Sequence, residues 1–170
     1  MIKGGTGGGN TQSGLRFEAR INIGEALTKI PGFEIKGHEV YKDGVKVAHL
    51  YSKHKLYTLL LAERKIDHRI LSKKLLPDEA ILVGDTLYIV EMKFQFVAGS
   101  VDEKLQTCDF KKRQYSKLFN ESGIIVQYIY VLNDWFKKPE YKDVLEYVSE
   151  VGCHYFFNEI PLSFLKLQEP

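Results

Sequence analysis

The spacing of hydrophobic residues changes along the first third of the chain, and each change predicts an element. Apolar residues recur at helix spacing over 12–29, and Pro31-Gly32 would end that helix. Two runs typical of strands, 40–41 and 45–50, flank Lys42-Asp43-Gly44, which is a β-hairpin signal. We therefore expect a helix followed by a hairpin.

The middle of the chain carries the clearest strand pair. The β-rich runs 80–83 and 86–90 flank Gly84-Asp85, whose residue types suit a two-residue hairpin turn. Ser100 and Glu103 have the spacing of a capping box, which predicts a helix beginning at 101. The other elements expected are helical or irregular segments at 54–63 and 66–75, a helix continuing to 120, a buried strand at 124–132, a helix at 139–151, a strand at 153–157 and a final helical turn at 161–167.

This order predicts one mixed α/β domain spanning 1–170, with a central mixed β-sheet flanked by helices. The Gly-rich stretch 1–11 lacks the preceding strand and the Gly-Lys-Ser/Thr ending of a phosphate-binding loop. It is interpreted as a flexible arm.

Net charge, cysteine content and apolar runs exclude only some functional classes. The formal net charge is +2, so a nucleic-acid-binding face would have to gather its lysines and arginines locally. Two cysteines, Cys108 and Cys153, are too few for a disulfide framework or a zinc site. With no apolar signal segment or membrane-length apolar run, a soluble, cytoplasmic protein is expected.

Counting outward from the turn at Gly84-Asp85 brings three charged residues together. In that register Asp78 faces Glu91 across the strand pair, and Lys93 shares their face because strand side chains alternate. Two facing carboxylates repel unless a cation neutralises them. Oxygen ligands of this kind suit Mg²⁺, which would polarise a phosphate and lower the pKa of a bound water. Asp78 and Glu91 are thus candidate metal ligands.

A simpler interpretation is a surface hairpin in which Lys93 pairs with Glu91. The neighbouring Leu87, Ile89 and Phe94 favour an interior position instead. The shared face of Asp78 and Glu91 depends on register, because a slip by one residue would move Asp78 to the opposite face.

The motif Pro77-Asp78, twelve intervening residues and Glu91-Met92-Lys93 resembles the PD-(D/E)xK signature of restriction-endonuclease-like nucleases. The stretches Glu91-Met92-Lys93-Phe94-Gln95 and 99–107 are most similar to small type II restriction endonucleases. The resemblance covers roughly residues 12–157 and implies an αβββαβ core and Mg²⁺-dependent hydrolysis of DNA. It also implies Asp78 and Glu91 as metal ligands, Lys93 beside the attacking water, and further roles for Glu18 and Gln95, although a plain structural role is equally compatible with the last two.

Double-stranded DNA would then be the partner. Lys104, Lys111 and Arg113 of the helix after the motif are expected phosphate contacts. Lys53 and Arg69 lie in a segment, 33–76, that we expect to be a DNA-contacting insertion. Cutting both strands of a palindrome favours a homodimer. A repair, homing or junction-resolving nuclease and a non-catalytic DNA-binding module remain the alternatives.

Overall fold

The computed structural model describes residues 13–17 and 21–168, and its main feature is a seven-stranded sheet. The strand order follows the chain, with antiparallel pairing from β2 to β6 and parallel pairing from β6 to β8. The strands are β2 (Phe33–Lys36), β3 (Glu39–Lys42), β4 (Val45–Leu50), β5 (Glu79–Val83), β6 (Thr86–Lys93), β7 (Ile125–Leu132) and β8 (His154–Phe157). A mixed sheet flanked by helices is therefore confirmed.

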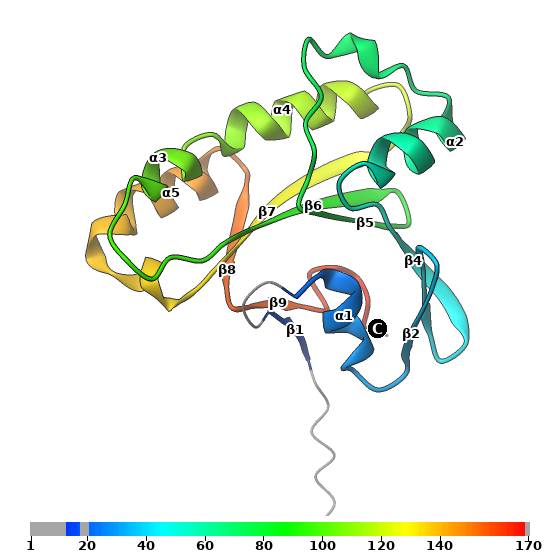
Figure 1. Cartoon of the computed structure of the whole chain (residues 1–170), viewed down its shortest axis with the longest axis horizontal. Coiled ribbons are helices and arrows are strands. Elements are labelled where there is room, and N and C mark those ends of the chain that lie inside the picture. Colours follow the sequence, from blue (N-terminus) through cyan, green and yellow to red (C-terminus); the bar gives the residue numbers. More distant parts are fainter. Residues whose placement is uncertain (1–12, 18–20, 169–170) are drawn as a thin grey trace, which may run out of the picture.

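Helices cover both faces of the sheet (Figure 1). One face carries α3 (Val101–Leu105), α4 (Cys108–Phe119) and α5 (Lys142–Glu150). The other carries α1 (Ile23–Thr28) and a small two-stranded sheet of β1 (Gly14–Arg16) and β9 (Glu159–Pro161). The buried hydrophobic residues accordingly form two clusters, one on each face. In the described part of the chain, no helix combines the length and apolarity needed to cross a bilayer.

Both predicted hairpins form, and the turn of each is two residues long, as expected for the one at Gly84-Asp85. In the first, Lys42 pairs with Val45, and Asp43 and Gly44 both have positive φ, at 49° and 79°. Those angles are what a primed hairpin turn requires. In the second, Val83 pairs with Thr86, and the register runs without interruption to Glu79 opposite Val90. The expected register of the motif hairpin is confirmed from Val83–Thr86 to Glu79–Val90, one step short of Asp78 and Glu91.

The helix expected over 12–29 is wrong in its first half. Residues 14–16 form β1, which pairs antiparallel with β9 and places Leu15 in the core. Among the described residues of this stretch, only Ile23–Thr28 is helical, and the Asn22 side chain accepts the Glu25 N–H at 2.8 Å as its N-cap. Pairing with a strand 143 residues away overrides the local helical spacing, which a single-segment pattern cannot detect.

The helix expected over 101–120 is broken into α3 and α4. Ser100 makes no side-chain capping hydrogen bond, so the predicted capping box is wrong. At the break, the Thr107 hydroxyl donates to the Lys104 carbonyl at 2.8 Å, and the Tyr130 hydroxyl donates to the Lys104 and Leu105 carbonyls at 3.3 and 3.4 Å. Side chains thus satisfy carbonyls that a continuous helix would have bonded internally.

Several smaller elements also differ from the sequence prediction. β2 was not expected, and with β3 and β4 it makes residues 33–50 part of the main sheet. The 54–63 segment is a π-helix (Leu56–Leu61) continued by α2 (Ala62–Arg64), and a 3₁₀ turn (His68–Ile70) follows. Residues 162–166 form turns rather than the expected helix, while β9 occupies 159–161.

Candidate functional site

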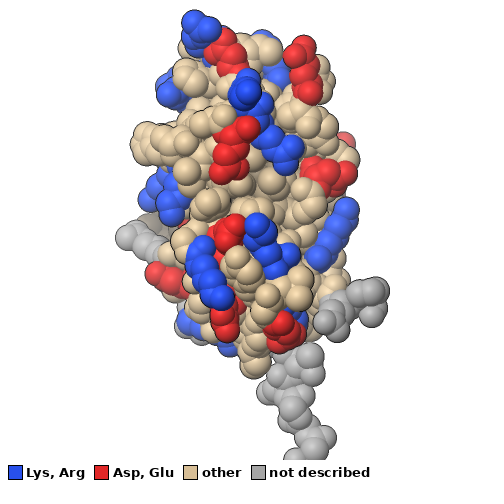
Figure 2. Space-filling model, turned by 90° about the vertical axis from the view of Figure 1, so that its right-hand side faces the viewer, with Lys and Arg blue, Asp and Glu red and all other residues tan. Residues whose placement is uncertain are grey.

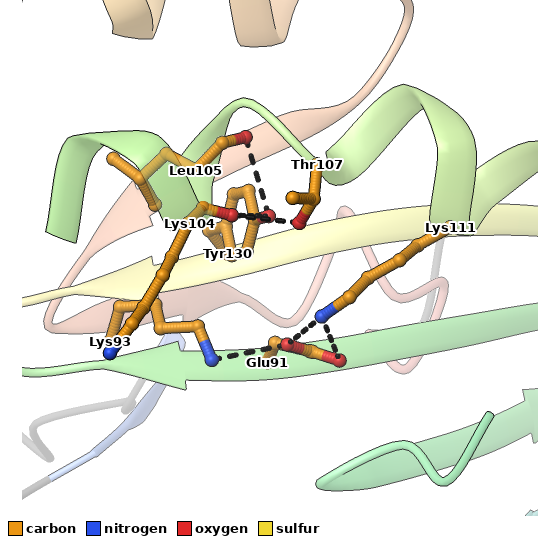
Figure 3. A network of polar contacts seen from close by, with 7 residues as sticks. All are labelled: Glu91, Lys93, Lys104, Leu105, Thr107, Lys111 and Tyr130. Carbon is orange, nitrogen blue, oxygen red and sulfur yellow. Dashed lines mark hydrogen bonds and ion pairs between the residues drawn. The ribbon is translucent and has the colours of Figure 1, made fainter.

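The candidate site lies at the C-terminal end of β6, on the face covered by α3 and α4. Alternation along β6 puts Glu91 and Lys93 on the face that also bears Leu87 and Ile89 of the core. Glu91 is buried, with 7% of its side chain exposed, and the Lys93 ammonium lies 3.2 Å from its Oε2. Glu91 and Lys93 therefore share a face as expected, and they form an ion pair (Figure 3).

A second lysine reaches the same carboxylate from the helical layer. The Lys111 Nζ of α4 donates to both oxygens of Glu91, at 3.3 Å to Oε1 and 3.1 Å to Oε2. Figure 3 shows the two ammonium groups approaching Glu91 from different elements. The Lys111 contact joins residues twenty positions apart in sequence.

Opposing effects set the ionisation of Glu91. Burial raises its pKa, but the charges of Lys111 and Lys93 and the hydrogen bonds from both hold the pKa below the ordinary value. Glu91 is therefore ionised at neutral pH, as a carboxylate ligand to a hard cation must be.

Tyrosines surround this carboxylate. Tyr130 lies beside Glu91 in the parallel pairing of β6 and β7, and its hydroxyl bonds the carbonyls that end α3. The Tyr128 hydroxyl is buried without a hydrogen bond among the described residues. Burial and then the charge of Glu91 raise the pKa of both Tyr128 and Tyr115. The pKa of Tyr130 is raised as well, so all three phenols stay neutral beside the charged groups of the site.

Asp78 immediately precedes β5 and continues its alternation. It has the parity of Ala80 and Leu82, which belong to the core on the α4 face. The negative charge of Asp78 raises the pKa of Tyr115, as that of Glu91 does. Asp78 also borders a cleft of about 920 Å³ that opens on the α1 side. It thus lies at the N-terminal end of β5, an interior strand of the sheet, with the parity of the Glu91 face and beside the cleft.

The neighbouring acid, Glu79, was not anticipated from the sequence. It points to the α1 side, where it accepts the backbone N–H of Ile23. Burial raises its pKa to about 7, and the Asp78 charge adds to that rise. A glutamate beginning a strand of apolar residues was the available signal, because a charge inside such a run must find a partner.

Two further residues named from the resemblance have different outcomes. Gln95 lies in the loop after β6, its side chain donating to the Val97 carbonyl and its backbone bonding Asn133. The structure thus directs the Gln95 amide to its own loop. Glu18 and the 1–11 arm lie outside the described residues.

The expected DNA contacts are dispersed. Lys104 lies on α3, and its side chain extends toward the Lys93 end of β6 (Figure 3). The Lys53 backbone N–H donates to the Pro77 carbonyl at 2.9 Å, so this exposed lysine neighbours Asp78. Arg113 pairs with Asp109 within α4 at 2.9 Å. Arg69 pairs with Asp67 at 2.8 Å and lies near the C-terminal end of α4, away from Lys111.

The face bearing the hairpin strands does not display one continuous basic patch. Figure 2 shows lysines and arginines interspersed with acidic side chains there. Ion pairs such as Lys46 with Glu39, at 3.0 Å, account for part of this pattern. This face therefore offers separate cationic side chains to phosphates.

The site offers few side chains that could coordinate a hard divalent cation. Across residues 13–17 and 21–168, no group of three or more His, Cys, Asp and Glu side chains gathers around one point. Mg²⁺ is commonly held by one or two carboxylates, with waters and substrate phosphate completing the shell. Glu91 is one such carboxylate, buried and ionised, and Asp78, which precedes β5 with the parity of the same face, is the candidate for the second.

Lys111 is the site residue whose position the sequence analysis missed. It was expected to be a peripheral phosphate contact, yet it lies on the stripe formed by Cys108, Tyr115 and Leu118, all buried. A lysine at i+3 from one apolar residue and i−4 from the next signals a buried or half-buried ion pair.

Comparison of the chain with protein-family models, with curated proteins and with solved structures finds no match.

Proposed function

We propose that this protein is a Mg²⁺-dependent endonuclease that hydrolyses phosphodiester bonds of double-stranded DNA, with Asp78, Glu91 and Lys93 at its centre. The observation that carries the proposal is Glu91, a carboxylate buried at a strand end, kept ionised and touched by Lys93 at 3.2 Å. Burying such charges costs several kcal/mol per ion. A gain in stability therefore does not by itself explain why they are buried here. Groups of this kind concentrate at functional sites.

The topology supports the same proposal. When β2, β3 and the short helices between are left out, the chain order is α1, the antiparallel strands β4, β5 and β6, then α4 and β7, with β7 parallel to β6. That succession corresponds to the αβββαβ order of the restriction-endonuclease-like core suggested by the motif. The acid pair would then lie on the second and third strands of the core.

Each residue has a chemical task under this proposal. Asp78 and Glu91 would hold the ion through their carboxylate oxygens. Mg²⁺, when bound, supplies Lewis-acid polarisation of the phosphate and a water of lowered pKa. The Lys93 ammonium donates hydrogen bonds beside Glu91, where it can orient a nucleophilic water and stabilise negative charge developing on the phosphate.

We further propose a type II restriction activity at a short specific site, performed by a homodimer because two symmetry-related sites can cut both strands. Incubation with plasmid or phage DNA and Mg²⁺ should give discrete fragments, and EDTA should abolish them. Glu91→Gln should reduce cleavage by about 10³-fold, the order seen when a transition-state contact is lost. Glu34→Gln, which neutralises an exposed acid on β2, is the matched control.

The contacts of Glu91 also favour a second candidate. Two lysines already neutralise this carboxylate, which is compatible with a DNA-binding module whose acids only form ion pairs. That candidate predicts retarded but uncut DNA, insensitive to EDTA. Nicking restricted to branched DNA would instead favour a repair or junction-resolving nuclease.

A further inference from the structure

Lys111 occupies a distinctive position relative to the Glu91 carboxylate. Its Nζ lies 3.3 and 3.1 Å from the two oxygens, whereas the Lys93 Nζ pairs with Oε2 at 3.2 Å. An ammonium nearly equidistant from both oxygens lies in the fork of the carboxylate. A divalent cation coordinated by this carboxylate would need one or both of the same oxygens.

We propose that Lys111 is a mobile cation of the active site, which holds Glu91 until a divalent ion binds and then donates to a phosphate of the DNA. This inference rests on the proposed nuclease function. It assigns Lys111 to the catalytic centre, in contact with the substrate.

The placement of Lys111 permits such a movement. Its side chain is 28% exposed, so it reaches solvent although Cys108 and Tyr115 on the same stripe of α4 are buried. The four-carbon stem can swing while its lower part stays against the core. Lys93, two residues from Glu91 on the same strand and 23% exposed, is tied more closely to the strand end.

Charge balance gives a reason for the movement. Glu91 already has two ammonium groups within hydrogen-bonding distance, so a divalent ion at the same carboxylate would meet both of them. Like charges a few ångströms apart in a partly buried site repel by several kcal/mol. An incoming phosphate is a strong acceptor for the displaced ammonium. Metal and DNA binding would therefore be coupled through Lys111.

The alternative is a structural ion pair in which Lys111 only anchors α4 to the sheet. Calorimetric titration with Mg²⁺ alone, without DNA, separates the two. Lys111→Gln should bind Mg²⁺ at least about fivefold more tightly than wild type, the lower end of typical coupling between sites. Lys111→Arg keeps the cation and should bind as wild type does. Lys117→Gln, the same charge change in the last turn of α4, is the matched control.

The outcomes distinguish the inference from the function on which it rests. Equal affinity of wild type and Lys111→Gln overturns the role of Lys111 and leaves the metal site standing. No Mg²⁺ binding by either protein overturns both. Wild-type crystals grown with and without Mg²⁺ give a readout independent of the stability of any variant. With Mg²⁺ the Lys111 Nζ should leave hydrogen-bonding distance of Glu91, and an unchanged contact contradicts the inference.

The proposed contact between Lys111 and a DNA phosphate can be tested separately. Binding of duplex DNA is measured over a range of salt concentrations, with Ca²⁺ or with EDTA. If Lys111 is released to a phosphate, wild type should show a steeper salt dependence with Ca²⁺, by about one phosphate contact. Lys111→Gln should show no such difference. The same slope in both conditions for wild type contradicts the transfer of Lys111 to DNA.

Discussion

Glu91 and Tyr130 lie side by side on the parallel strands β6 and β7, and each connects the sheet to the helical layer. Glu91 does so through Lys111 of α4, and Tyr130 through the carbonyls of Lys104 and Leu105 at the end of α3. The break between α3 and α4 is therefore anchored directly above the carboxylate. This anchoring sets where α4 starts, and so where Lys111 can reach.

Two tyrosines on β7 should respond oppositely to loss of the hydroxyl. Tyr130→Phe removes hydrogen bonds to two carbonyls and should lower the free energy of unfolding by about 1 kcal/mol. Tyr128→Phe removes a buried hydroxyl without a partner among the described residues, so stability should stay unchanged or rise. Urea denaturation of the two variants measures both effects. Equal losses would contradict this account of the α3–α4 junction.

His154 should make stability depend on pH. Burial, and then the charge of Lys112, lowers its pKa below the ordinary 6.5, so the unfolded chain takes up the proton first as the pH falls. The contribution is fully present above about pH 6.5 and is lost as the pH drops below that value. His154→Gln should therefore lose less stability than wild type on acidification. Denaturation is measured for both proteins at each pH. An equal loss of stability on acidification in wild type and His154→Gln would refute this.

The dispersed lysines should contribute to DNA binding through phosphates. Lys104→Gln and Lys53→Gln should each reduce the slope of log affinity against log salt concentration by about 0.9. Arg69 and Arg113 are each held by an aspartate, so their replacement should have a smaller effect. Lys142→Gln, on the outer side of α5, is the control. If neither Lys104→Gln nor Lys53→Gln changes the slope, DNA binds elsewhere on the surface.

What the sequence could predict was local. The two-residue turn between Val83 and Thr86 sets the register of the motif hairpin, so the side on which Glu91 and Lys93 lie follows from turn chemistry and alternation. The pairing of the 45–50 strand with its neighbour follows in the same way from Asp43 and Gly44.

What the sequence could not predict depends on distant contacts. Residues 14–16 form a strand only because β9 offers a partner near the other end of the chain. The 101–120 helix breaks because Tyr130 and Thr107 satisfy carbonyls at the junction. Lys111 joins the site because that break and the packing of α4 on the sheet aim it at Glu91. Local propensity does not encode such relationships.

The central claim is that Asp78 and Glu91 together hold one divalent cation. Anomalous diffraction from a crystal soaked in Mn²⁺, which takes the same oxygen ligands as Mg²⁺, tests it directly. We expect an anomalous peak within about 2.5 Å of carboxylate oxygens of both residues, and we expect its loss in Glu91→Gln crystals. A peak elsewhere, or Mn²⁺ bound equally well without the Glu91 carboxylate, would contradict it.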